Sequence, residues 1–165
     1  MTEKIQNLIG ALRRELEQYG EMLARLEVQQ EKIVARSGDE VYQTIAPIKA
    51  QATEIQQARA NRETCSGELA QSLGRPRDTT FAELVPLLPA EYRPLVVALV
   101  EENNALLVRV RQRVRQNHLR LSRSIELMQN LINSLFPSRE PRVYNGRGSA
   151  ASRRALQRWT YEAVG

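Results

Sequence analysis

The stretch that decides the fold runs from Leu95 to Leu135 and reads LVVALVEENNALLVRVRQRVRQNHLRLSRSIELMQNLINSL, without glycine or proline. Within it, apolar residues recur every seven positions, at Val100, Leu107, Val114, Leu121, Met128 and Leu135. Seven residues make about two helical turns, so these side chains share one side of an α-helix. We therefore predict one long helix over 89–136. Pro89 opens it, because proline is favoured in a first helical turn, and Pro137 ends it.

A second line of residues lies three positions after the first and mixes polar with apolar side chains. It consists of Asn103, Val110, Asn117, Ser124 and Leu131. A buried amide costs free energy unless it is hydrogen-bonded, so the two asparagines need partners. Either they set the register of packed helices, as a core asparagine does in a coiled coil, or they contact a partner helix or a loop that caps the bundle. The first interpretation is favoured.

The N-terminal part of the chain predicts two more long helices. The first covers 2–36, with Thr2 as its N-cap. Its apolar stripe consists of Ile5, Ile9, Leu12, Leu16, Tyr19, Leu23, Leu26 and Ile33. After the breaker Ser37-Gly38-Asp39, a short helix over 39–45 is followed by a restart at Pro47 and a helix ending at Leu73. Gly74 is the expected residue after the cap.

A short helix and a tail complete the expected architecture. Residues 74–80 form a loop, and Thr80 with Glu83 forms a capping box for a helix over 81–88. Narrow apolar stripes bury by packing against each other, so the fold class is all-α. We expect an elongated antiparallel bundle of three long helices with a short accessory helix and a C-terminal tail. Residues 1–136 would be a helical rod domain.

The C-terminal tail, residues 137–165, is rich in turn-forming residues such as Asn145-Gly146. A weak helix over 151–163 would carry Leu156 and Trp159 on one side. Burying these few apolar side chains does not offset the conformational entropy of ordering the segment. We therefore expect a flexible tail that becomes ordered mainly on a partner.

Composition limits the class of protein. The chain has 165 residues, of which 42% are hydrophobic and 26% charged. No apolar run approaches the length of a membrane-spanning helix, and the first residues do not form a signal peptide. We expect a cytoplasmic protein without membrane insertion. The single cysteine, Cys65, excludes an internal disulfide.

An enzymatic function is not expected. The chain contains one histidine, His118, and one cysteine, and it lacks a glycine-rich phosphate loop, a GxSxG elbow and an HExxH motif. Cys65 lies on the apolar side of its predicted helix and is interpreted as a core residue, whereas His118 is interpreted as a solvated or capping side chain. We expect no cofactor and no metal, because four ligands are needed for a structural zinc site.

Positive charge is concentrated towards the C-terminus. Residues 109–136 contain six arginines and one glutamate, a net charge of +5, and residues 137–165 carry +4. Arg109, Arg111, Arg113 and Arg115 alternate, and Arg120 and Arg123 follow. The favoured interpretation is two solvated flanks that pair with acidic residues of neighbouring helices. The alternative is a nucleic-acid surface on a basic coiled-coil scaffold.

The order of these features resembles the FlgN-type flagellar export chaperones. Two charged helices precede the segment FAELVPLLP at residues 81–89, and Asn103-Asn104 follow early in the last helix. The helix continues with NHLRLSRSIELMQNLIN at 117–133, and a tail with VYNGRG follows at 143–148. The chain departs from the pattern in having Ser-Ile for Ser-Leu, Pro47 and an arginine-rich last helix.

The resemblance implies a cytoplasmic chaperone, not an enzyme, that binds hook-associated proteins and delivers them to the flagellar type III export apparatus. It implies that much of the client binding lies in the C-terminal region, and that Tyr144 is a candidate for docking on the export gate. The expected partner-binding residues are Asn117, Leu121, Met128, Leu135, Val143, Tyr144, Leu156 and Trp159. No nucleic-acid partner is expected, and the identity of the client and the oligomeric state stay open.

Overall fold

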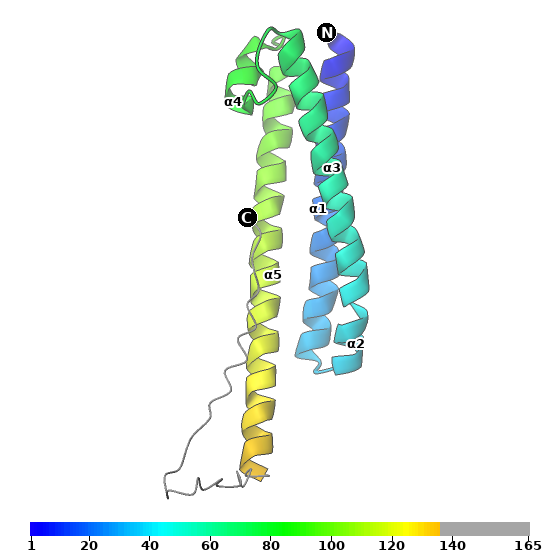
Figure 1. Cartoon of the computed structure of the whole chain (residues 1–165), viewed down its shortest axis with the longest axis vertical. Coiled ribbons are helices and arrows are strands. Elements are labelled where there is room, and N and C mark those ends of the chain that lie inside the picture. Colours follow the sequence, from blue (N-terminus) through cyan, green and yellow to red (C-terminus); the bar gives the residue numbers. More distant parts are fainter. Residues whose placement is uncertain (136–165) are drawn as a thin grey trace, which may run out of the picture. The chain divides into compact units, whose positions relative to one another are not determined.

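The computed structural model describes residues 1–135, which form five α-helices and one short 3-10 helix (Figure 1). In chain order these are α1 (Thr2–Val34), α2 (Gly38–Gln43), α3 (Ile45–Ser72), α4 (Phe81–Leu84), η1 (Val85–Leu87) and α5 (Arg93–Leu135). None of these residues forms a strand. The all-α prediction is confirmed, with three long helices and a short accessory helix.

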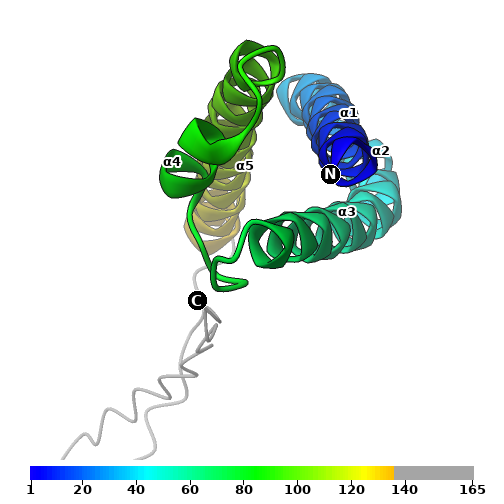
Figure 2. The same ribbon diagram turned by 90° about the horizontal axis from the view of Figure 1, so that it is seen from above.

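The chain divides into two compact units, Met1–Glu126 and Leu127–Gly165. The first unit holds α1, α3 and most of α5 at the three corners of a triangle (Figure 2). The backbones of α1 and α3 approach each other closely, and α5 is joined to α1 by hydrogen bonds from Asn103 and Asn117. The expected domain boundary at residue 136 stays a prediction. The expected tail, including its weak helix over 151–163, lies outside the described residues.

The first unit contains two apolar clusters. One lies near the α3–α4 connection and is centred on Ile5, Leu8, Leu12, Leu69, Leu84, Leu88 and Val96. The other lies further along α1 and is centred on Tyr19, Met22, Leu23, Leu26 and Val110. The apolar stripe predicted for the first helix is confirmed, since all its members are buried except the half-buried Leu16.

Four buried polar residues of the first unit lie on α1 and α3: Glu15, Gln18, Gln51 and Ser66. The Glu15 carboxylate accepts a hydrogen bond from Tyr19 Oη at 3.0 Å and one from Arg62 Nε at 2.8 Å. Gln51 Nε2 donates to Gln18 Oε1 at 2.8 Å. These bonds satisfy groups whose burial would otherwise be costly, and they connect α1 to α3.

The ends of the first two long helices agree with the predicted breakers, with small shifts. Helix α1 has Met1 as its N-cap, so Thr2 is the first helical residue and not the cap. The chain reverses at Arg36, whose φ is 57°, and Ser37 is the N-cap of α2. Helix α3 begins at Ile45, which leaves Pro47 in the first turn, where its missing N–H has no helical acceptor to lose.

The C-terminal end of α3 has the predicted glycine in a left-handed conformation. Gly74 has φ +70°, its N–H donates to the Gln71 carbonyl at 3.1 Å, and the Arg75 N–H donates to the Ala70 carbonyl at 2.9 Å. This pair of bonds is a Schellman motif, which satisfies the last carbonyls of a helix.

The accessory helix and the start of α5 differ from the prediction because of two prolines. Thr80 and Glu83 form the expected capping box, but the α-helix ends at Leu84 and continues as η1, because Pro86 cannot donate to the preceding turn. Residues 89–92 form a turn, so α5 begins at Arg93 and not at Pro89. A start at Pro89 would place Pro94 where a helical N–H is needed.

Candidate functional site

The contact between α5 and α1 contains both asparagines of the polar line. Asn103 Nδ2 donates to the Leu12 carbonyl at 3.0 Å and to the Leu99 carbonyl at 2.9 Å. Asn117 Nδ2 donates to the Leu26 carbonyl at 2.8 Å and to Gln29 Oε1 at 3.1 Å. Both asparagines are buried inside the bundle, as the register interpretation expects. The Oδ1 atom of each is buried without a partner.

The same contacts show which line of α5 is buried. The line from Val100 to Leu135 is only partly covered in the first unit, since Val114 is 48% exposed and Leu107 is half-buried. The buried side chains of α5 are Val96, Leu99, Asn103, Val110 and Asn117, and all of them except Leu99 belong to the line that carries the asparagines. Two adjacent seven-residue lines lie within one face of a helix, and hydrogen bonds to α1 favour the polar line.

The two asparagine bridges also define where α1 ends along α5. Both join residues that are 91 positions apart, so α1 and α5 run parallel with a constant offset. This offset places Val34, the last residue of α1, level with Ile125.

Helix α5 carries large exposed apolar side chains in its last turns, in the unit that begins at Leu127. These are Leu127 (66% exposed), Met128 (62%), Leu131 (53%), Ile132 (53%) and Leu135 (63%). We call this segment the apolar end of α5, residues 127–135. Single exposed apolar residues are common, but a group of five within nine residues is typical of an interaction surface.

The expected partner-binding residues fall in three different places. Met128 and Leu135 lie in the apolar end of α5, Leu121 is half-buried in the first unit, and Asn117 is buried with its amide bonded to α1. Val143, Tyr144, Leu156 and Trp159 lie outside the described residues. Sequence reasoning did not include Leu127, Leu131 and Ile132, although apolar residues become denser along the chain after residue 124 and could have indicated them.

The arginine-rich stretch 109–123 is mostly solvated. Arg109, Arg111, Arg115, Arg120 and Arg123 are exposed, and Arg113 is half-buried. Arg113 Nη2 lies 3.5 Å from Glu27 Oε1, and no other ion pair within residues 1–135 involves this stretch. The expectation of pairing with neighbouring helices therefore holds for Arg113 alone among these six in the described structure.

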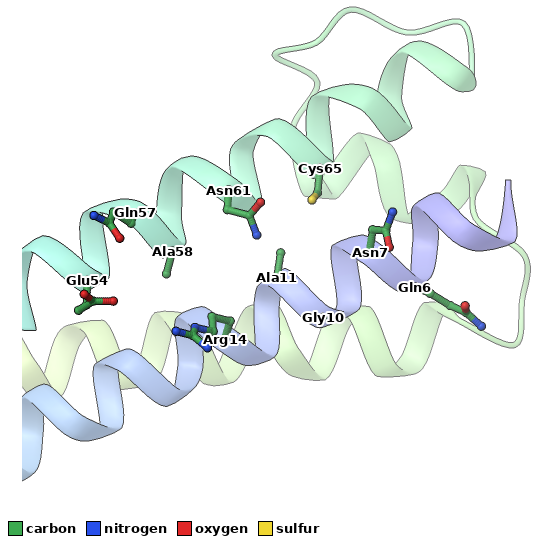
Figure 3. A pocket seen from close by; sticks show the side chains of 10 residues that line it. All are labelled: Gln6, Asn7, Gly10, Ala11, Arg14, Glu54, Gln57, Ala58, Asn61 and Cys65. Atoms are coloured by element: carbon green, nitrogen blue, oxygen red, sulfur yellow. The ribbon is translucent and has the colours of Figure 1, made fainter.

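A polar groove of about 590 Å³ lies between α1 and α3 (Figure 3). Gln6, Asn7 and Arg14 line it from α1, and Asn61 and Cys65 line it from α3. Burial, and then the negative charge of Glu68, raises the pKa of the Cys65 thiol, so the sulfur is held as a thiol and not as a reactive thiolate.

The groove therefore lacks the elements of a nucleophilic site. Cys65 packs against the first apolar cluster, as expected of a core residue, and the exposed His118 lies on α5 and not in the groove. Across the described part of the chain, no group of three or more histidine, cysteine, aspartate or glutamate residues could hold a metal ion. No helix in residues 1–135 is long and apolar enough to cross a membrane.

The comparison with known families agrees with this arrangement of helices. The model of the family described as FlgN protein matches residues 1–152, which is most of the chain. No curated protein and no solved structure gives a significant match. The chain thus belongs to the FlgN family, whose members are non-enzymatic, cytoplasmic flagellar export chaperones for the hook-associated proteins.

Proposed function

We propose that hook-associated clients bind this chaperone at the apolar end of α5, residues 127–135, together with the tail residues Val143, Tyr144, Leu156 and Trp159. The observation that carries the proposal is the group of five large apolar side chains in 127–135, each more than half exposed. An amphipathic client helix would cover these side chains and remove them from water, which is the usual way in which a helix binds an apolar surface.

The described helices offer one further reason to choose this end of the molecule. Most of the large apolar residues of α1 and of the first part of α5 already belong to the two core clusters. No residue of 127–135 belongs to either core cluster. Binding there would add a helix without opening either core cluster.

The proposal is tested by the double substitution Met128→Glu and Leu131→Glu. Glutamate keeps the helix propensity of these positions, so α5 should still form, whereas burial of two carboxylates against an apolar client helix is unfavourable. Titration calorimetry with the terminal segment of a hook-associated protein should show binding by the unaltered chain and a loss of at least about tenfold in affinity for the variant.

A matched control is Tyr42→Glu on α2, which also places a carboxylate at an exposed position, since Tyr42 is 75% exposed. This control should bind the client segment as the unaltered chain does. If the Met128/Leu131 variant keeps full affinity while its circular dichroism is unchanged, clients bind elsewhere on the molecule.

We further propose that Tyr144 contacts the export gate once a client is bound. Tyr144→Ala should then reduce secretion of hook-associated proteins by motile cells more than it reduces client affinity in solution. Equal losses in the two measurements would show that Tyr144 acts on the client and not on the gate.

A further inference from the structure

We infer that α5 has a second, outward-facing contact surface in the first unit, built from Val108 and Leu119 with arginines along both edges, and that it fits an acidic amphipathic helix of another protein. This inference does not depend on where clients bind. It rests on the side of α5 that faces away from α1.

The direction of this surface follows from the buried positions of α5. Asn103, Val110 and Asn117 face α1 and mark the inner side of the helix. At about 100° per residue, Val108 and Leu119 point roughly opposite to that inner side. They are eleven residues apart, close to three full turns, and so lie above one another on the outer side. Their side chains are 51% and 57% exposed.

The arginines are arranged in two rows beside these apolar side chains. At the same helical spacing, Arg111 and Arg115 lie along one edge of the Val108–Leu119 line. Arg109 and Arg123 lie along the other edge, whereas Arg113 and Arg120 border a pocket that Glu27 and Glu31 of α1 also line. The four arginines of the two rows are exposed, and none of them forms an ion pair within residues 1–135.

The sequence contains no acidic residue between Glu102 and Glu126, so nothing on this part of α5 neutralises the rows. Two exposed apolar side chains flanked by like charges suit a partner helix of opposite charge, since charges beside a helix contact choose the partner, as they do in a coiled coil. The complementary partner is a helix with an apolar stripe edged by aspartate or glutamate.

A nucleic acid is the less favoured occupant of this surface. A duplex backbone would use the arginines but would leave Val108 and Leu119 in contact with phosphates and water, which gains nothing from their burial. A helix with an acidic border uses both features. The apolar pair therefore distinguishes the two classes of partner.

The experiment uses the full chain and two synthetic helical peptides of equal length with the same leucine stripe, one edged by glutamate and one edged by glutamine. Fluorescence anisotropy should show tighter binding of the glutamate-edged peptide. Arg111→Glu with Arg115→Glu should weaken that binding at least about tenfold, because close charge pairs become repulsive.

Two further variants separate this surface from general attraction by the basic chain. Leu119→Ser keeps every charge and should also weaken binding of the glutamate-edged peptide. Arg13→Glu with Arg14→Glu, at two exposed positions of α1, makes the same change in charge and should leave affinity close to that of the unaltered chain.

Three outcomes would overturn the inference. The first is equal binding of the two peptides. The second is binding that falls with the Arg13/Arg14 variant as much as with the Arg111/Arg115 variant. The third is weak peptide binding beside tight, strongly salt-dependent binding of a mixed-sequence DNA duplex, which would assign the arginines to nucleic acid. The Met128/Leu131 variant should bind the glutamate-edged peptide as the unaltered chain does. A negative result for this surface is therefore separate from a negative result for client binding at the apolar end of α5.

Discussion

Asn103 shows how a single polar residue positions α5 on α1. Its amide nitrogen donates to carbonyls of both helices, while its oxygen is buried without a partner. An apolar residue of similar size would leave no unsatisfied oxygen. It would, however, allow α5 to pack against α1 in several registers. The amide instead favours the one offset at which its donors reach the Leu12 and Leu99 carbonyls.

We predict that Asn103→Asp destabilises the bundle by about 3 kcal/mol at pH 7, because a buried carboxylate would face two carbonyl oxygens. Asn104→Asp is the matched control, since Asn104 is exposed, and should change the free energy of unfolding by less than about 0.5 kcal/mol. Urea denaturation followed by circular dichroism measures both. Equal stabilities for the two variants would contradict a structural role for the Asn103 donors.

The pH dependence of the Asn103 variant follows from burial. Burial raises the pKa of the introduced carboxyl group above its unfolded value, so the folded state binds the proton more tightly. The variant should therefore recover part of its lost stability, relative to the Asn104 control, as the pH falls from 7 to about 4.

Tyr19 provides a second residue-scale prediction. Burial, and then the neighbouring Glu15 carboxylate that accepts its hydrogen bond, raises the pKa of Tyr19 to about 12. The folded-state pKa exceeds the unfolded value of about 10. The contribution of the neutral phenol to the free energy of unfolding is therefore fully present below pH 10 and is lost as the pH rises towards 12. The free energy of unfolding should fall by about 3 kcal/mol at most over this range.

Chemical denaturation between pH 9 and 12 checks this prediction. Tyr19→Phe should remove this part of the pH dependence, whereas Tyr42→Phe, at an exposed position of α2, should keep it. Parallel pH profiles for the unaltered chain and Tyr19→Phe would show that Tyr19 is not the group responsible.

At the scale of elements, the end of α3 depends on the left-handed backbone of Gly74. A Cβ added at Gly74 would have no atom within 4 Å, so substitution meets no steric contact and only the backbone conformation is strained. Gly74→Ala should therefore lower the stability by about 1 kcal/mol.

Gly10 is the matched comparison, because a Cβ there also meets nothing within 4 Å but the residue is inside α1 with ordinary helical backbone. Gly10→Ala should raise the stability by roughly 0.5–1 kcal/mol. Thermal unfolding of the two variants should thus shift in opposite directions, and a shift in the same direction would show that the backbone at residue 74 is not the cause.

At the scale of the whole molecule, the residues that form both core clusters lie between Ile5 and Val110. We predict that deleting residues 137–165 leaves the thermal midpoint of the helices unchanged and abolishes client binding. Circular dichroism and calorimetry on the same preparation measure the two effects. A lower midpoint would show that the tail stabilises the helices, and unchanged binding would limit the client site to α5.

The parts of the fold that sequence reasoning predicted are those governed by local chemistry. The Thr80–Glu83 capping box, the glycine after α3 and the apolar stripe of α1 depend on residues within one or two turns of each other. The start of α5 was misplaced because Pro89 and Pro94 both suit a first turn. Only the turn closed by the Tyr92 N–H and the Pro89 carbonyl distinguishes the two starting points.

The candidate site was predicted less completely. Met128 and Leu135 were expected to contact a partner, and both lie in the exposed apolar end of α5. Leu127, Leu131 and Ile132 were missed because the apolar candidates on α5 were taken from the line from Val100 to Leu135, which does not contain them. Their exposure is a property of the folded helix that seven-residue spacing does not give.

The amino-acid sequence by itself determined that the chain is helical, where most helices end and that its positive charge lies towards the C-terminus, because periodicity, caps and breakers act over a few residues. Only the tertiary structure decided which of the two adjacent lines of α5 is more buried in the first unit and which arginines remain unpaired within residues 1–135. These depend on hydrogen bonds and contacts between residues distant in the chain, and the more polar line is buried where α1 offers acceptors to Asn103 and Asn117.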